Sequence, residues 1–148
     1  MAESALLDPI VGAFVAAARR ATLATVAPDG RPRLVPVCFV LLGEVVYTPL
    51  DEKPKSVEDP RRLARVLDVL ANPTATLLVD RWDEDWTRLG WVRMDGEAGL
   101  LEPPGDEHAA AVAALVARYP QYASHRLDTR PVIRIAVRRV VSWGRLRA

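Results

Sequence analysis

The chain has 148 residues, of which 50% are hydrophobic and 26% charged, and its 20 basic side chains nearly balance 19 acidic ones. This composition is typical of a folded globular protein, and we expect one domain over residues 1–148. The formal net charge of +1 argues against nucleic acid as a partner, and no apolar run approaches the roughly 20 residues that span a bilayer.

The N-terminus has no basic region ahead of its apolar segment, so no secretory signal is expected and the protein is expected to be cytoplasmic. Cys38 is the only cysteine, which excludes an intrachain disulfide and a thiolate zinc site. Because it lies in the apolar run V-P-V-C-F-V-L-L, we expect it to be a small core residue.

The first half of the chain predicts a helix followed by three strands. Residues 9–20 favour a helix, because Asp8 can cap it, Pro9 suits its first position and two arginines close it. The strand A-T-L-A-T-V-A, the turn P-D-G and the strand R-P-R-L-V-P-V-C-F-V-L-L come next. A G-E turn at 43–44 then leads into V-V-Y-T. We expect a three-stranded meander in which Pro36 marks a sheet edge or a bulge.

A second helix is predicted after the stretch D-E-K-P-K-S-V-E-D-P-R-R. Its N-cap is either Ser56, with Asp59 three residues on, or Asp59 itself, followed by Pro60 in the first position. Both starts leave Arg61 and Arg62 at the first turn. The apolar residues at helical spacing are Leu63, Val66, Leu67 and Leu70. The residues off that stripe are Arg61, Arg62, Arg65 and Asp68.

The second half of the chain predicts further strands and a third helix. T-A-T-L-L-V-D and R-L-G-W-V-R-M-D-G-E-A-G-L-L-E are extended, and the D-G pair at 95–96 fits either a hairpin turn or a bulge. Residues 105–118 favour a helix. In the last strand, P-V-I-R-I-A-V-R-R-V-V-S-W-G, the alternation fails at 138–139, which indicates a bulge. Six or seven strands with three helices predict a mainly β, α+β fold: an antiparallel barrel or sandwich with peripheral helices.

Few residues could carry acid–base or metal chemistry. The sequence has no dinucleotide, P-loop, nucleophile-elbow or zinc-protease motif. His108 and His125 lie in polar contexts, and we expect both at the surface. If the protein is an enzyme, a bound cofactor therefore carries the chemistry.

The acidic loop between the fourth and fifth predicted strands carries two tryptophans. Its acids lack the spacing of a calcium loop, which favours a solvated loop; they are Asp80, Asp83, Glu84 and Asp85. Trp82 and Trp86 could be core lids, oligomer contacts or one wall of a pocket for a flat ring, with core or dimer packing favoured.

The only two lysines of the chain, Lys53 and Lys55, stand together just ahead of the second helix. Cations at a helix N-terminus oppose the helix dipole, and a bound phosphate would resolve that conflict. Acidic neighbours make the stretch nearly neutral, however, so ion pairs on a solvated loop account for it equally well. Residue chemistry alone leaves both interpretations open.

The order of motifs resembles a known family. L-A-T-V-A-P-D-G-R-P-R-L-V-P-V-C-F-V, D-E-K-P-K-S, A-N-P-T-A-T-L-L-V-D-R-W-D-E-D-W and P-V-I-R-I-A-V-R-R-V-V-S-W-G are similar to the split β-barrel, flavin-reductase-like group that includes the pyridoxamine-phosphate oxidases. The resemblance covers residues 12–146 and extends to the actinobacterial branch that uses the deazaflavin coenzyme F420. It implies an FMN-binding-like split β-barrel and a homodimer with two cofactor sites at the subunit interface.

The resemblance also implies how the cofactor phosphate is held. Lys55 falls where a basic residue of the strand-to-helix loop grips the phosphate, with Lys53, Ser56 and Arg62 as helpers. In the flavin oxidases a serine-arginine-lysine run commonly holds the FMN phosphate. Pro54 replaces that arginine here, which favours F420 over FMN.

Further contacts are implied along two strands and from the partner. In such proteins the second strand runs beside the ring system, at residues Pro36, Val37 and Cys38. Thr48 and Pro49 line the phosphate end, and Trp86 approaches the ring from the partner subunit. The implied activity is hydride transfer between reduced F420 and a small organic acceptor, with no catalytic side chain. An FMN-dependent oxidase or reductase, and a non-catalytic F420- or flavin-binding protein, stay open as alternatives.

Overall fold

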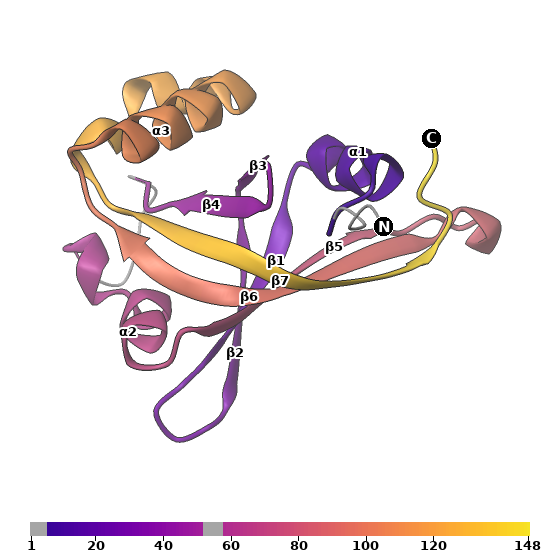
Figure 1. Ribbon diagram of the computed structural model, residues 1–148, viewed down its shortest axis with the longest axis horizontal. Helices are drawn as coiled ribbons and strands as arrows, with labels where there is room; N and C mark the ends of the chain where they lie inside the picture. Colours follow the sequence, from indigo (N-terminus) through magenta and orange to yellow (C-terminus); the bar gives the residue numbers. More distant parts are fainter. Residues whose placement is uncertain (1–5, 52–57) are drawn as a thin grey trace, which may run out of the picture.

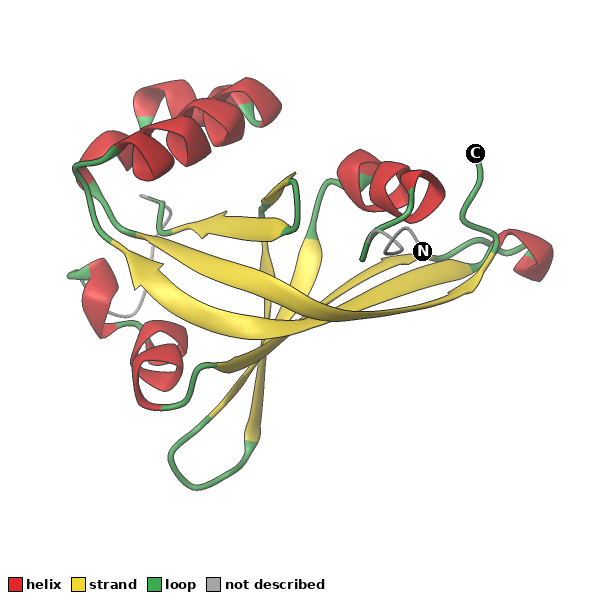
Figure 2. Cartoon of the chain, in the orientation of Figure 1, coloured by secondary structure: helices red, strands yellow, loops and turns green. Residues whose placement is uncertain are grey.

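The computed structural model describes residues 6–51 and 58–148, and it is built around one antiparallel sheet (Figures 1 and 2). The seven strands follow the order β2-β1-β5-β6-β7-β4-β3. Their bounds are β1 Ala21–Val26, β2 Pro32–Val37, β3 Val40–Leu42, β4 Val45–Pro49, β5 Thr74–Arg81, β6 Gly90–Leu101 and β7 Val132–Gly144. The strand count agrees with the sequence prediction of six or seven.

Within residues 6–51 and 58–148, three α-helices and four short 3₁₀ turns accompany the sheet. The helices are α1 Pro9–Ala17, α2 Ala64–Ala71 and α3 Asp106–Arg118, and the turns are η1 Pro60–Arg62, η2 Trp86–Arg88, η3 Pro120–Ser124 and η4 Leu127–Thr129. Asp8 caps α1 as predicted, but the helix ends three residues early because Ala18 is extended. No helix in the described part of the chain is long and apolar enough to cross a bilayer.

The sheet is so strongly curled that its two edges share one core. Val37 of the edge strand β2 and Val46 of β4 belong to the same buried cluster as Leu23 of β1 and Ile135 of β7. α1 packs on both β3 and β6, and α2 packs on β1 and β6. Sharing of one core by both edges is what a partly closed barrel requires. The predicted split β-barrel with peripheral helices is confirmed.

The predicted three-stranded meander is wrong, because its second strand is divided between the two edges of the sheet. β2 pairs with β1, whereas β3 pairs with β4 at the opposite edge. The side chain of Phe39, between them, is fully buried. The hydroxyl of Tyr119 accepts from the Phe39 N–H at 3.2 Å and lies 3.1 Å from its carbonyl oxygen, so it satisfies the backbone where the ladder stops. Pro36, as predicted, lies on an edge strand.

The buried face of α2 differs from the predicted apolar stripe. Leu63 and Val66 are buried, but Leu67 and Leu70 are 52% and 59% exposed. Asp68, expected on the polar side, is only 2% exposed. The helix is rotated in this way because its carboxylate binds two side chains of the sheet. α2 also begins only at Ala64, so the two arginines expected in its first turn lie in η1 instead.

Two predicted irregularities in the long strands are one bulge. The register between β6 and β7 shifts at Asp95 and Gly96, where Asp95 faces Arg139 and Gly96 faces Val137. Arg138 is therefore the extra residue of β7. This bulge settles the choice left open for the D-G pair at 95–96, and it confirms the irregularity predicted at 138–139.

Gly144, at the end of β7, has a backbone that only glycine adopts easily. Its φ is +87°, and a Cβ there would lie 2.2 Å from the carbonyl oxygen of Leu89. We expect Gly144→Ala to lower the free energy of unfolding by about 3 kcal/mol, and Tm by roughly 6–12 °C, in a thermal melt. Gly12→Ala in α1 is the matched control, since its Cβ meets nothing within 4 Å. It should stabilise the helix slightly, and similar melts for the two variants would contradict the prediction.

Candidate functional site

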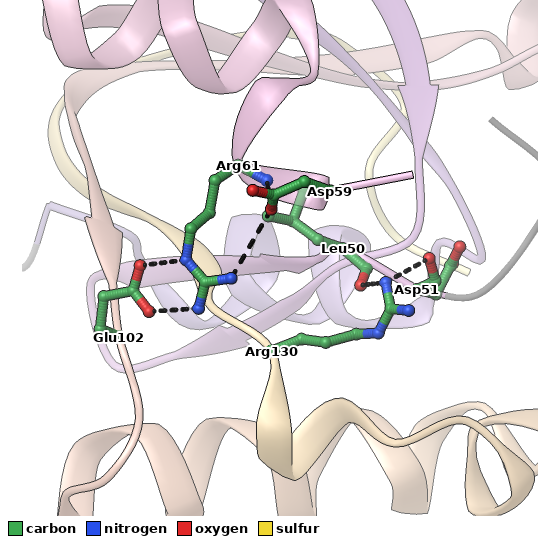
Figure 3. Close-up of polar contacts among 6 residues, drawn as sticks. All are labelled: Leu50, Asp51, Asp59, Arg61, Glu102 and Arg130. Carbon is green, nitrogen blue, oxygen red and sulfur yellow. Dashed lines mark hydrogen bonds and ion pairs between the residues drawn. The ribbon is translucent and has the colours of Figure 1, made fainter. Parts of the chain in front are cut away.

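Three of the residues predicted to hold a phosphate are described: Thr48 and Pro49 lie at the end of β4, and Arg62 lies just before α2. Lys53, Lys55 and Ser56 lie outside the described residues. Their flanks are described, and Figure 3 shows the polar contacts on both sides.

The end of β4 carries a buried hydroxyl group without a partner. Thr48 is 1% exposed and pairs with Ile133 of β7, so it points to the inner side of the sheet. Its Oγ1 has no hydrogen-bond partner, and an unpaired buried hydroxyl costs free energy. Pro49, the next residue, is also buried. An orphaned donor at this position suits the phosphate end that the resemblance assigns to Thr48.

Asp51, two residues after β4, is held by the segment that follows α3. The Tyr122 hydroxyl donates to Asp51 Oδ2 at 2.6 Å, and both side chains are buried. Burial and this hydrogen bond raise the pKa of Tyr122 far above its usual range, so the phenol stays protonated. Arg130 Nη1 lies 3.3 Å from the carbonyl oxygens of Leu50 and Asp51 (Figure 3). These contacts fix the backbone at the end of β4.

Asp59 and Arg61 are held on the far side of the undescribed residues. Asp59 caps η1 by accepting from the Arg61 N–H at 3.0 Å. Arg61 donates through two nitrogens to Glu102, at 2.8 and 2.7 Å, as Figure 3 shows. These hydrogen bonds lower the pKa of Glu102. Arg61 is thus committed to a carboxylate, whereas Arg62 is exposed and can face an incoming anion.

Arg65, in the first turn of α2, is the residue that sequence reasoning missed. Its side chain is half-buried, and its Nε is buried without a hydrogen-bond partner. Burial lowers the pKa of this guanidinium, and the nearby Asp51 and Tyr122 act in the opposite direction. A half-buried cation with a free donor fits an anion. Its position one helical turn after Arg61 and Arg62 is the signal that could have found it.

The three residues predicted beside the ring do not share one face. Pro36 is exposed, on the outer face of β2, opposite Thr22 of β1. Val37 is 8% exposed and belongs to the core, so only its backbone could reach a ligand. Cys38 is partly buried beside the second apolar cluster, under α3, and its thiol interacts with the Tyr122 hydroxyl. Of these side chains, Pro36 alone is presented on the outer face.

The outer face of the sheet holds a shallow groove of about 490 Å³ next to Pro36. Thr22 and Leu34 line one side, and Leu78, Trp91 and Arg93 line the other. Trp91 is paired with Trp143 of β7, which is 54% exposed. Exposed aromatic and aliphatic groups on the outer face of a sheet are typical of a surface that another molecule covers.

Trp82 and Trp86 are not core residues in this chain, since they are 66% and 70% exposed. Trp86 lies in η2, in the connection between β5 and β6, whereas α2 lies at the opposite end of the sheet (Figure 1). The eight residues of β5 separate the two ends by roughly 23 Å. Trp86 and Arg62 of one chain are therefore too far apart to hold the same small group. The prediction that Trp86 serves the partner's site stays a prediction.

A larger cavity, of about 600 Å³, lies between α1 and the C-terminal residues. Arg81, its central basic group, is already engaged. It donates from Nε to the Arg88 carbonyl at 2.9 Å, donates to the Arg145 carbonyl, and lies over the ring of Phe14 at 5.3 Å. We therefore place the candidate phosphate end at β4 and α2, on the inner side of the sheet, and the candidate ring contact at the groove on its outer face.

The histidines and acids add no metal site. His108 is 3% exposed and its Nε2 lies 2.6 Å from the Arg130 carbonyl, so its predicted surface position is wrong. It is buried because α3 packs that face against the connector before β7. His125 is half-buried against Tyr122, with ring centroids 5.4 Å apart. Within the described residues, no group of three His, Cys, Asp or Glu side chains is arranged to hold a metal ion.

Comparison with known proteins gives one family match and several similar folds. A conserved hypothetical protein of Mycobacterium tuberculosis superposes with a TM-score of 0.74 and 21% identity, over 97% of this chain and 90% of that one. A heme-binding protein of Mycobacterium smegmatis superposes with a TM-score of 0.75 and 23% identity, over 97% of this chain and 55% of that protein. HutZ, the heme storage protein of Vibrio cholerae, superposes with a TM-score of 0.68 and 14% identity, over 93% of this chain and 94% of that protein. No curated protein matches the sequence.

These structures share the fold, and the sequence match is more specific. The family profile described as pyridoxamine 5'-phosphate oxidase matches residues 7–144, nearly the whole chain. Its extent covers the seven strands and three α-helices of the described residues, and with them the outer groove and the predicted phosphate end. The chain therefore belongs to the pyridoxamine 5'-phosphate oxidase family and has its split β-barrel fold.

Proposed function

We propose that the protein is an F420-dependent oxidoreductase that passes a hydride between reduced F420 and a small organic acceptor. The observation that carries the proposal is Arg65, a half-buried guanidinium with a free Nε at the start of α2. Thr48, near the end of β4 and ahead of residues 52–57, supplies a second buried donor without a partner. Two such donors fit a phosphate, which has three strong acceptor oxygens.

Further residues of the proposed phosphate end are Lys55, Lys53, Ser56 and Arg62. The first three lie outside the described residues, and their role rests on the sequence. The sequence D-E-K-P-K-S, in place of a serine-arginine-lysine run, favours F420 over FMN. Basic groups around the phosphate would bind the cofactor, while Pro36 and the outer groove would orient its ring.

The proposed reaction needs no acid or base from the protein. The chemistry that F420 supplies when bound is hydride donation from C5 of the reduced deazaflavin, with release of a ring N–H proton, so that the acceptor can gain both a hydride and a proton. The described groove lining contains no histidine or cysteine; its ionisable residues are Asp80 and Arg93. The chain's own residues therefore bind, orient and exclude water.

We also propose a homodimer in which the outer faces of two sheets meet. Leu34, Trp91 and Trp143 expose apolar area beside the groove, and a second copy would bury it. Trp86 of one protomer would then reach the cofactor of the other, as the resemblance implies. The separation of Trp86 from α2 within one chain supports this arrangement.

A titration distinguishes the proposed cofactors. We expect F420 fluorescence to change with a dissociation constant in the low micromolar range, about tenfold or more below that for FMN. Reduced F420 should then be oxidised by at least one acceptor in a panel of enones and quinones, followed by the return of deazaflavin absorbance. Protein that purifies yellow with tightly bound FMN, and ignores F420, would overturn the F420 assignment. Binding without oxidation across the panel would favour the non-catalytic alternative.

The heme-binding neighbours suggest heme as another ligand, but the groove does not favour it. None of its described lining residues is a histidine, cysteine, methionine or tyrosine that could ligate iron. The Nε2 of His108 is already engaged with a backbone carbonyl. Titration with hemin under the same conditions should give no Soret shift of a ligated heme.

A further inference from the structure

Asp68 is a buried carboxylate that the proposed function does not yet use. It lies on α2, is 2% exposed, and accepts from two side chains of the sheet. The Thr25 hydroxyl of β1 donates to Oδ2 at 2.8 Å, and Arg33 Nε of β2 donates to the same oxygen at 2.7 Å. A buried charge needs such partners, because an unpaired one is strongly destabilising.

The two donors are neighbours on the inner face of the sheet. Thr25 and Arg33 are directly opposite each other in the β1–β2 ladder. Asp68 therefore ties α2 to the outermost pair of strands at one point. β2 is an edge strand, so backbone hydrogen bonds hold it on one side only. The ion pair between Arg33 and Asp68 is its side-chain link to the helix.

Both elements joined by this link belong to the proposed cofactor site. Asp68 follows Arg65, the proposed phosphate ligand, by three residues on the same helix. Arg33 precedes Pro36, the proposed ring contact, by three residues on the same strand. The link thus fixes the distance between the group that would hold the phosphate and the strand that would hold the ring. A cofactor that uses both contacts at once needs this distance to be constant.

We propose that the Arg33–Asp68 ion pair is a positioning contact of the cofactor site, which sets α2 in register with β2. It touches neither the cofactor nor the acceptor. Its effect is that the phosphate and the ring of one cofactor molecule can reach their contacts on α2 and β2 at the same time. The inference rests on the proposed function, since it requires a cofactor that carries a phosphate.

The test measures how much the phosphate contributes to binding. The probes are F420 and its ring fragment without the phosphate-bearing tail, together with FMN and riboflavin as a second pair. For each protein the ratio of the two dissociation constants reports the phosphate contribution. We expect wild type to prefer the phosphorylated member, and Asp68→Asn to reduce that ratio by about tenfold, because a misplaced binding group loses much of its effect.

Asp68→Asn should fold, since asparagine can still accept from Thr25 and Arg33 is 43% exposed in its side chain and can be solvated. Arg33→Lys keeps the charge and should retain part of the wild-type ratio of dissociation constants, whereas Arg33→Ala should lose it. Arg31→Ala is the matched control: Arg31 lies at the turn of the same hairpin and pairs with Asp29 at 3.9 Å, with both side chains exposed. It should leave the ratio unchanged.

The outcomes separate this inference from the function on which it rests. If wild type binds the phosphorylated and unphosphorylated probes equally, the proposed phosphate site is wrong and the inference is overturned with it. If wild type prefers the phosphorylated probe and Asp68→Asn keeps the full ratio, the inference alone is wrong. Uniform weakening of both probes would show a structural role only, and would also overturn it.

Discussion

Arg65→Ala is expected to weaken binding of the phosphorylated cofactor by about 10- to 100-fold, because charge-assisted hydrogen bonds of about 1.5–3 kcal/mol are lost. The same change should leave the unphosphorylated ring fragment almost unaffected. Isothermal titration or F420 fluorescence measures both. The unpaired Nε is the observation on which this expectation rests.

Stability gives an independent readout of the same variant. Burial of the Arg65 guanidinium already disfavours its charged form, so Arg65→Ala should lower the free energy of unfolding of the unliganded protein by less than about 1 kcal/mol.

Arg62→Ala should have a smaller effect on binding than Arg65→Ala, of about five-fold or less, since an exposed cation is screened by solvent. Unchanged cofactor affinity in Arg65→Ala, with an intact fold, would remove Arg65 from the site.

Leu78→Lys is expected to convert the proposed dimer into a monomer and to abolish cofactor binding. Leu78 lines the outer groove, paired with Thr22 of β1 and Arg93 of β6. If a second copy covers this face, the lysine would be buried against apolar groups. A change at the centre of an interface typically costs 2–4 kcal/mol, which raises the dimer dissociation constant roughly 30- to 1000-fold. Light scattering after size-exclusion chromatography measures the change in mass.

Leu67→Lys is the matched control for this variant. Leu67 is 52% exposed on α2. The same substitution there places a lysine on a face that we do not assign to the dimer. It should stay dimeric and bind the cofactor normally. Near-ultraviolet circular dichroism should show that both variants are folded. If Leu67→Lys dissociates while Leu78→Lys does not, the interface lies on α2 and the proposed arrangement is wrong.

Local signals in the sequence were sufficient for most elements. Alternation and turn residues predicted the strands, Asp8 and Pro9 the start of α1, and the broken period at 138–139 the bulge in β7. These features depend on neighbouring residues alone, which is why they can be derived without tertiary structure. The motif order also predicted the family, which the profile match confirms.

The division between β2 and β3 depended on contacts that are distant in sequence. Nothing local in V-P-V-C-F-V-L-L marks a break at Phe39. The chain can leave one edge and join the other there because Tyr119, 80 residues away, binds the buried backbone groups of Phe39 that no strand pairs. The orientation of α2 has the same origin, since Thr25 and Arg33 of the sheet draw Asp68 inward.

The lysine-containing stretch shows both sides of this division. The sequence by itself determined that Lys53 and Lys55 stand between a strand and a helix, and that the order of motifs is that of a split β-barrel. Only the tertiary structure decided that Arg61 is committed to Glu102 while Arg65 and Thr48 keep unpaired donors. The reason is physical: whether a charged or polar group is free to bind a ligand depends on its burial and on partners that the fold brings from elsewhere in the chain.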